Sequence, residues 1–290
     1  MEIEQQTSEL VAHYQSGRLT DAEKLARSII RDFPDHNFAW KVLSAVLRTT
    51  GRMSEALEAS QKTVTISPQD AAAHSNLGII LKELGQLDEA KESFIRAITL
   101  KNDFAEGHNN LGVTQKDLGN LSEAEASLRQ AIFLKTNYAE AHNNLGKTLQ
   151  DLGRLQEALV SYARAIELKP DYDKALVNLG IAIETITFNS ANPNLYPLLT
   201  RLLITGNFTR PINVAVSILS LLKHDTQIKD LMLEKNFALN LNEATSIIKS
   251  LYKIPLLHHL MRVCPLPDLQ FEALFISIRN FLLKNLDNID

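Results

Sequence analysis

The chain has 290 residues, of which 45% are hydrophobic, so it can bury a sizeable core, and its length suggests about two domains. A net charge of -4, with no basic run, argues against a dedicated nucleic-acid-binding protein. No window contains the roughly 18 apolar residues of a membrane span, and the start MEIEQQTSEL is polar and acidic, so a cytoplasmic location without membrane insertion is expected.

From residue 3 onward the sequence repeats every 34 residues. The phrase AHSNLG at 73–78 returns as GHNNLG at 107–112 and as AHNNLG at 141–146. Glycine and alanine recur in the same register, and the spacing never slips. The units run over 3–36, 37–70, 71–104, 105–138 and 139–172, with a further first helix from 173 to about 187.

Each unit has the hydrophobic pattern of two antiparallel helices. In the unit 71–104, Leu77, Leu81 and Leu84 form one apolar stripe and Gly85 ends it. A second stripe follows at Ala90, Phe94, Ala97 and Ile98. Glycine at the eighth position and alanine at the twentieth would let the two helices approach closely. The glycine between the helices would supply the positive φ that a helix end commonly needs.

This pattern resembles the tetratricopeptide repeat, a 34-residue helix-turn-helix with the signature W-x2-L-G-x2-Y, then A-x3-F, then P. WKVLSAVL at 40–47 keeps the opening with Ser44 in place of Gly, and EALVSYARAIELKP at 157–170 keeps the second helix nearly whole. The resemblance implies an all-α fold, a right-handed α-α superhelical solenoid over 3–187. The first unit is atypical, as the solvent-facing end of a solenoid is expected to be.

Asparagine recurs at the sixth position of four successive units, although its helix propensity is modest. The members of this asparagine row are Asn76, Asn110, Asn144 and Asn178, and Val42 interrupts the row in the second unit. Stacked units place equivalent residues in a line on one face of the first helices. In a tetratricopeptide solenoid this face would line the concave groove, where primary amides can bond the main chain of an extended peptide.

The asparagine row resembles that of the repeat superhelix of the O-linked N-acetylglucosamine transferase, whose asparagines contact the substrate backbone. The resemblance implies a peptide-binding groove, and replacing Asn110 and Asn144 by alanine would then weaken binding without lowering stability. Alternatively the row is inert, solvating the groove or bonding neighbouring asparagine amides. The charged neighbours of the row mix both signs, which predicts only modest electrostatic selectivity: Lys82, Lys116, Lys147, Glu83, Asp117 and Asp151.

No cofactor and no metal ion is expected. His74, His108 and His142 repeat with the units, but stacked repeats separate them by about a helix-packing distance of 8 to 10 Å, too far to share one zinc ion, so a packing role is predicted. The GKT at 146–148 lacks the first glycine of a phosphate-binding loop. Cys264 is the only cysteine, which excludes an intrachain disulfide.

Beyond about residue 189 the period is lost and a C-terminal helical domain over 190–290 is predicted. Its apolar stripes are wide, so the helices should pack together or on the solenoid end, with Pro211 in a first helical turn and Asn242 and Asp268 as N-caps. The segments 207–225 and 260–283 loosely resemble helices found after the repeats of bacterial proteins that continue into a transferase domain. The expected helices are 195–205, 211–223, 226–235, 242–252, 256–263 and 268–286.

The leading hypothesis is a non-enzymatic scaffold or adaptor that holds a protein or peptide segment in the groove, since the chain has no catalytic motif. The alternative is the substrate-recognition or non-catalytic portion of a tetratricopeptide-containing glycosyltransferase or methyltransferase. A third hypothesis is a homo-oligomer formed through the C-terminal helices, or their folding back over the groove.

Overall fold

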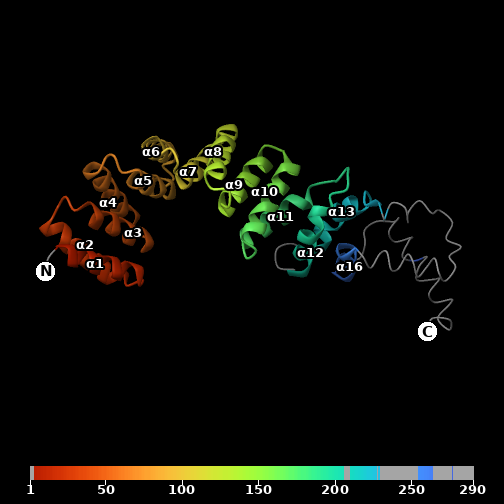
Figure 1. Ribbon diagram of the computed structural model, residues 1–290, viewed down its shortest axis with the longest axis horizontal. Coiled ribbons are helices and arrows are strands. Elements are labelled where there is room, and N and C mark those ends of the chain that lie inside the picture. The colour runs from red at the N-terminus through yellow and green to blue at the C-terminus, as the bar shows by residue number, and fades with distance from the viewer. Residues whose placement is uncertain (1–2, 206–209, 227, 229–253, 264–275, 277–290) are drawn as a thin grey trace. The chain divides into compact units, whose positions relative to one another are not determined.

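The computed structural model describes residues 3–205, 210–226, 228, 254–263 and 276 (Figure 1). These ranges are helical and contain no strand. By its contacts the chain divides into two compact units, Met1–Thr148 and Leu149–Asp290. The all-α fold of tandem helix pairs followed by further helices is confirmed, whereas the predicted domain bounds at 3–187 and 190–290 stay a prediction.

Five helix pairs and one further first helix follow the 34-residue period. Every first helix begins at the first residue of its predicted unit, because the loop lengths within and between the pairs are constant. The pairs are α1 (Ile3–Gln15) with α2 (Leu19–Asp32), α3 (Asn37–Thr49) with α4 (Met53–Ile66), α5 (Ala71–Glu83) with α6 (Leu87–Leu100), α7 (Ala105–Asp117) with α8 (Leu121–Leu134), and α9 (Ala139–Asp151) with α10 (Leu155–Leu168); α11 (Asp173–Glu184) follows.

The two helices of a repeat approach closely at the small residues. A Cβ atom added to Gly112 would lie 2.7 Å from Cγ of Leu128 and 3.1 Å from the main-chain oxygen of Ala124. A Cβ atom on Gly78 would lie 2.8 Å from the ring of Phe94. The alanine at the twentieth position of each repeat is fully buried: Ala22, Ala56, Ala90, Ala124 and Ala158.

The second repeat has Ser44 where the later repeats have glycine and the first has Leu10, and Ser44 contacts the facing helix directly. The Ser44 hydroxyl donates to the main-chain oxygen of Ala56 at 3.0 Å. Ser44 is buried, so this bond satisfies a polar group that would otherwise be costly at the contact.

The turn inside each repeat depends on a glycine with positive φ. Gly85 and Gly119, for example, have φ angles of 79° and 83°, and every other described residue with a positive φ is the equivalent glycine of another repeat. This conformation ends the first helix and lets the chain reverse within three residues. The predicted role of the inter-helix glycine is therefore confirmed.

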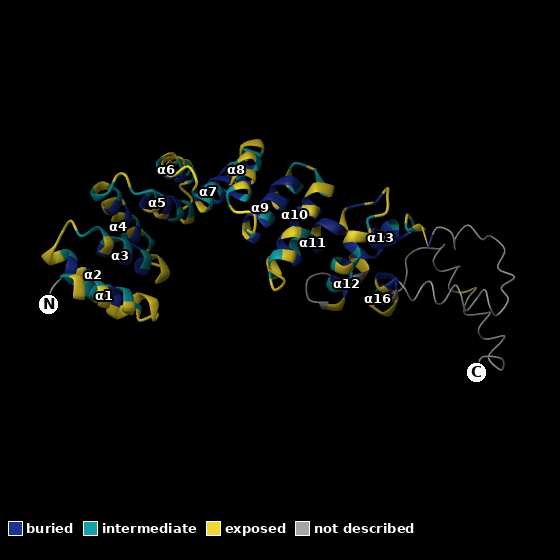
Figure 2. Cartoon of the chain, viewed as in Figure 1, coloured by how far each residue is buried: buried dark blue, intermediate teal, exposed yellow. Residues whose placement is uncertain are grey.

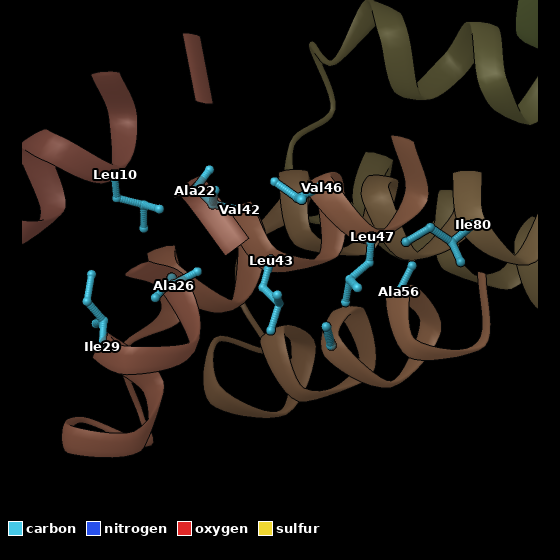
Figure 3. Close-up of a cluster of buried hydrophobic side chains, with 12 residues drawn as sticks. Leu10, Ala22, Ala26, Ile29, Val42, Leu43, Val46, Leu47, Ala56 and Ile80 are labelled. Carbon is cyan, nitrogen blue, oxygen red and sulfur yellow. The ribbon is translucent and has the colours of Figure 1, made fainter. Parts of the chain in front are cut away.

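Neighbouring repeats in the first unit share one apolar core. Leu10 of α1, Ala26 of α2, Leu43 and Leu47 of α3 and Ile80 of α5 belong to a single buried cluster (Figure 3). The helices of the repeats accordingly carry both buried and exposed residues (Figure 2). No repeat could bury its apolar face alone, which is why the array depends on stacking.

A ring nitrogen at the fourth position ties four of the first helices, α3, α5, α7 and α9, to the loop before each. A carbonyl oxygen can only accept, so the Nε2 atom of each histidine involved carries a proton. The predicted packing role of these residues thus includes a junction hydrogen bond. The bonds are Trp40 Nε1 to Pro34 O (2.7 Å), His74 Nε2 to Pro68 O (3.0 Å), His108 Nε2 to Asn102 O (3.2 Å) and His142 Nε2 to Thr136 O (3.3 Å).

The second unit packs the last repeat helices with those that follow. The short helix η1 (Pro193–Leu195) leads into α12 (Tyr196–Thr205), and then come α13 (Pro211–Leu222) and α16 (Pro255–Val263). Helix α13 contacts both α11 and α16, and α12 contacts α16. The C-terminal helices therefore pack together and on the end of the repeats, as predicted.

Some predictions for this region concern residues outside those described. Pro211 lies in the first turn of α13, as expected. Nearly all of the expected helices 226–235, 242–252 and 268–286 lie outside the described ranges, as do the N-caps proposed at Asn242 and Asp268 and the lone Cys264.

We expect Gly112→Ala to lower the free energy of unfolding by about 1 to 3 kcal/mol, because the added methyl group overpacks against Leu128. Gly119→Ala should cost about 1 kcal/mol for another reason, namely its left-handed backbone, since nothing lies within 4 Å of a Cβ atom there. Chemical denaturation measures both. Substitution by asparagine distinguishes the two causes, because asparagine tolerates a positive φ. Gly119→Asn should lose less stability than Gly119→Ala, whereas Gly112→Asn should lose more than Gly112→Ala. The reverse order at either site would contradict the assigned cause.

Candidate functional site

The first unit has a cavity of about 290 Å³ that opens on the first helices of its first three repeats. Tyr14 of α1, Phe38 and Val42 of α3 and Asn76 and Ile79 of α5 contribute to its lining. We call this space the first-helix cavity. One residue of the predicted asparagine row, Asn76, therefore borders a real concavity.

Helix α3 supplies the apolar wall of the first-helix cavity. Phe38, Val42 and Ala45 lie at i, i+4 and i+7 and so share one face of the helix. Val42 is only 5% exposed and belongs with Leu43 and Leu47 to the buried core cluster, so it borders both the core and the cavity (Figure 3). The helix thus has two apolar faces, and Phe38 remains 39% exposed on the cavity side.

The cations that line the first-helix cavity are already paired. Lys41 forms an ion pair with Asp70, and Arg48 Nη1 lies 2.8 Å from Glu83 Oε1 in the next repeat. Asp70 is also the N-cap of α5 and accepts hydrogen bonds from the main-chain N–H groups of Ala72 and Ala73. Burial alone would raise the pKa of the Asp70 carboxyl, but the Lys41 ammonium and these N–H groups together hold that pKa below its usual value.

The asparagine row is not uniform in its surroundings. Asn76 on α5 is exposed and Asn110 on α7 is half-buried, and neither side chain has a hydrogen-bond partner among the described residues. Asn144 on α9 is half-buried and bonded to another side chain. Asn178 stands at the same position of α11 in the second unit, where it is also half-buried.

An amide bridge joins the fourth and fifth repeats. The Nδ2 atom of Asn144 donates to Oδ1 of Asn109 at 3.0 Å, and Asn109 is only 6% exposed. Asn144 therefore behaves as the hypothesis of an inert row expects, because its amide bonds to a neighbouring asparagine amide. The bridge also argues against the expectation that Asn144 can be replaced without lowering stability.

The charged neighbours of the row also differ in whether another side chain pairs with them. Glu83 is held by Arg48, and Lys116 Nζ lies 3.1 Å from Asp117 Oδ1 on the same helix. Lys82 and Lys147 form no ion pair within the described ranges, and Lys147 is exposed. Asp151 is exposed in the second unit, where burial first and its negative charge second raise the pKa of the Tyr162 hydroxyl.

Two features of the site could not be read from the row of asparagines. Asn109 was not among the residues predicted from the sequence. Its signal is the doubled asparagine of HNNLG in the fourth repeat, where the third repeat has HSNLG. The first-helix cavity was missed too, and its signal is the apolar trio Phe38, Val42 and Ala45 where the row is interrupted. The interruption marks an apolar hollow on the same helices.

The described residues contain no group of three or more His, Cys, Asp or Glu side chains that could hold a metal ion. Within the same ranges, no helix is both long and apolar enough to cross a bilayer. The cytoplasmic location stays a prediction. Ile212 and Val216, one turn apart on α13, are 48% and 60% exposed, and oligomerisation through the C-terminal helices also stays a prediction.

Models of the tetratricopeptide repeat match residues 9–71, 78–119, 116–153 and 139–172. No curated protein matches the chain.

Solved structures share the fold. PilF of Pseudomonas aeruginosa is 18% identical over 75% of this chain and 89% of its own, with a TM-score of 0.57. TTC0263 of Thermus thermophilus is 26% identical over 62% of this chain and 98% of its own, with a TM-score of 0.51. YrrB, described as a TPR protein with an unusual peptide-binding site, is 20% identical over 59% of this chain and 88% of its own, with a TM-score of 0.50.

We expect Asn144→Ala to lower the free energy of unfolding by about 1 to 3 kcal/mol, because it removes a donor from the buried Oδ1 atom of Asn109. Asn110→Ala should change it by less than about 0.5 kcal/mol, since its amide has no such partner. Both variants gain the same helix propensity, so the difference between them reports the bridge. Thermal and urea denaturation measure it, and equal stabilities would show that the bridge contributes nothing.

The pair of Lys41 and Asp70 predicts a pH dependence. Because the pKa of Asp70 is lower in the folded state than in the unfolded state, its charge stabilises the fold above about pH 4, and this is lost as the pH falls through the folded-state value. Asp70→Asn keeps the capping oxygen but not the charge. The variant should therefore be less stable by about 0.5 to 1 kcal/mol at neutral pH, and the difference should shrink in acid. Urea denaturation from about pH 7 down to about pH 2 tests this, and a constant difference would contradict it.

Proposed function

We propose, because the chain is a tetratricopeptide repeat protein, that it is a protein-interaction scaffold that holds an extended polypeptide segment across the first helices of its repeats. The observation that carries the proposal is the pair Asn76 and Asn110. Their amides stand at the same position of successive first helices and have no hydrogen-bond partner among the described residues.

Free amides suit the main chain of a peptide. Each can donate to a carbonyl oxygen and accept from an N–H group, so a row at a constant repeat spacing can bond an extended strand whatever its side chains. Asparagine is a modest helix former, and its recurrence at the sixth position of the first helices needs a compensating role. Peptide binding by YrrB, which shares the fold, agrees with this role.

The bridge between Asn109 and Asn144 divides the row into two kinds of member. Asn144 stabilises the repeat array, whereas Asn76 and Asn110 remain available to a partner. In this proposal the binding segment therefore lies over the third and fourth repeats of the first unit, and the contribution of Asn144 is to hold the repeats in register.

The resemblance of the asparagine row to that of a glycosyltransferase supports the same binding step in another setting. A recognition region of a larger transferase would hold its substrate polypeptide by these amides as well. Transfer of a sugar or methyl group would need catalytic residues, for which the sequence shows no motif. The scaffold is therefore the function proposed for this chain.

We expect Asn76→Ala combined with Asn110→Ala to weaken peptide binding about tenfold or more, because each lost hydrogen bond costs about 0.5 to 1.5 kcal/mol. Peptides are first selected from a random displayed library on the intact chain, and their affinities are then measured by calorimetry. The matched control is Gln61→Ala with Gln130→Ala, which removes two exposed amides from the second helices α4 and α8. Equal affinity in all three proteins, or a library that yields no binder, would overturn the proposal.

A further inference from the structure

We propose that the first-helix cavity is a subsite for one large apolar side chain, aromatic or long aliphatic, of the bound polypeptide. The inference rests on the proposed function, since the segment that carries this side chain is the one held by Asn76 and Asn110. It adds a sequence preference that main-chain hydrogen bonds alone cannot provide.

The size of the cavity suits a single side chain. Its volume is about 290 Å³. Pockets for whole drug-sized ligands and cofactors run from about 300 to 1,000 Å³, so this cavity lies at the lower end of that range. One ring or branched chain with part of its backbone fits this space better than a separate large molecule does.

The charged groups of the lining and the hydroxyls of Ser44 and Thr63 are satisfied before any ligand arrives, and Asn76 is the lining residue whose amide has no partner among the described residues. Lys41 and Arg48 are paired with Asp70 and Glu83, as described above. The hydroxyls of Ser44 and Thr63 donate to main-chain oxygens within the protein, at 3.0 and 2.9 Å. A charged occupant would find no free counter-charge among these residues, and an apolar occupant would leave none of them unpaired. The charge pattern therefore selects an apolar side chain.

Two aromatic rings of the lining, by contrast, are still partly exposed to solvent, although Val42 and Ile80 beside them are buried. Tyr14 and Phe38 are each 39% exposed although they border a concave space. Burying partly exposed rings of this kind against another ring or an aliphatic chain contributes favourable free energy to binding. Val42, Ala45 and Ile79 complete an apolar surface on which such a side chain can lie.

The position of Asn76 links the cavity to the main chain of the segment. Asn76 lines the cavity, and its amide has no partner among the described residues. A peptide whose main chain bonds to Asn76 has a neighbouring side chain at the mouth of the cavity. In the preceding repeat the sixth position is Val42, so the row changes from an amide to an apolar contact where the side chain would enter.

The test combines pocket and peptide variants of the intact chain. Library-selected peptides are expected to share one large apolar residue, and replacing that residue by alanine should weaken binding about ten- to a hundredfold. Ala45→Trp fills the cavity and should weaken binding of the parent peptide by a similar factor. It should weaken binding of the alanine-substituted peptide little further. The control Ala126→Trp places the same side chain on an exposed position of α8 and should change neither affinity.

A second variant tests the same inference in case Ala45→Trp does not fold. Phe38→Ala removes an exposed wall residue and should also lower affinity for the parent peptide only. Its control is Phe133→Ala, at a residue of α8 that is 77% exposed. Peptides that bind through Asn76 and Asn110 but are indifferent to Ala45→Trp and Phe38→Ala would overturn this inference and leave the proposed function standing.

Another occupant would give a different result. If a second copy of the chain fills the cavity, Ala45→Trp should shift the oligomeric state in light scattering without any peptide present, whereas Ala126→Trp should not. That outcome would overturn the assignment to a peptide side chain. Failure of any peptide to bind would overturn the proposed function itself.

Discussion

The contact on which the rest of the structure depends is the close approach of the two helices within a repeat, where from the second repeat onward a glycine or serine at the eighth position faces the alanine at the twentieth. Gly112 leaves no room for a methyl group beside Leu128, and Gly78 leaves none beside Phe94. Because the helices and loops keep the same lengths from repeat to repeat, equivalent residues recur at equivalent points of the first helices. The proposed binding surface is a consequence of that regularity, because a side chain at the sixth position of one repeat has a counterpart at the sixth position of the next.

The same regularity explains how far the sequence could be interpreted alone. Helix starts, the positive-φ glycines and the buried alanines could be predicted because each follows from a local pattern that recurs several times in one register. The bridge from Asn144 to Asn109 could not, because it depends on how far apart two repeats lie and on which amide turns toward the other. The cavity could not either, since it arises from the sizes of side chains on three first helices and on the second helix α4 at once. The consensus predicts the array, and departures from the consensus create the site.

The charged residues beside the asparagine row offer a partner less electrostatic attraction than their number suggests. The mixed signs beside the asparagine row predicted modest electrostatic selectivity, and the structure offers a cause: Arg48 with Glu83 and Lys116 with Asp117 neutralise one another within the chain. Exposed pairs of this kind add little stability, but they reduce the free charge beside the row to a few groups such as Lys82 and Lys147, so hydrogen bonding and apolar contact are the main forces available to a partner. The Lys41 and Asp70 pair acts in the same way at the cavity while also capping α5.

These two forces have different consequences for recognition. Amides that bond a peptide main chain contribute affinity without regard to sequence, because every residue except proline offers the same N–H and C=O groups. An apolar cavity discriminates among side chains, because burying a large apolar group stabilises a complex and a small one leaves the space unfilled. In the proposed complex, a surface that combines Asn76 and Asn110 with one hollow would therefore select partners by a single anchor and tolerate variation around it. Val42, which looks like a defect in the asparagine row, is in this view the residue that makes selection among partners possible, since an amide in its place would put an unpaired polar group against the anchor.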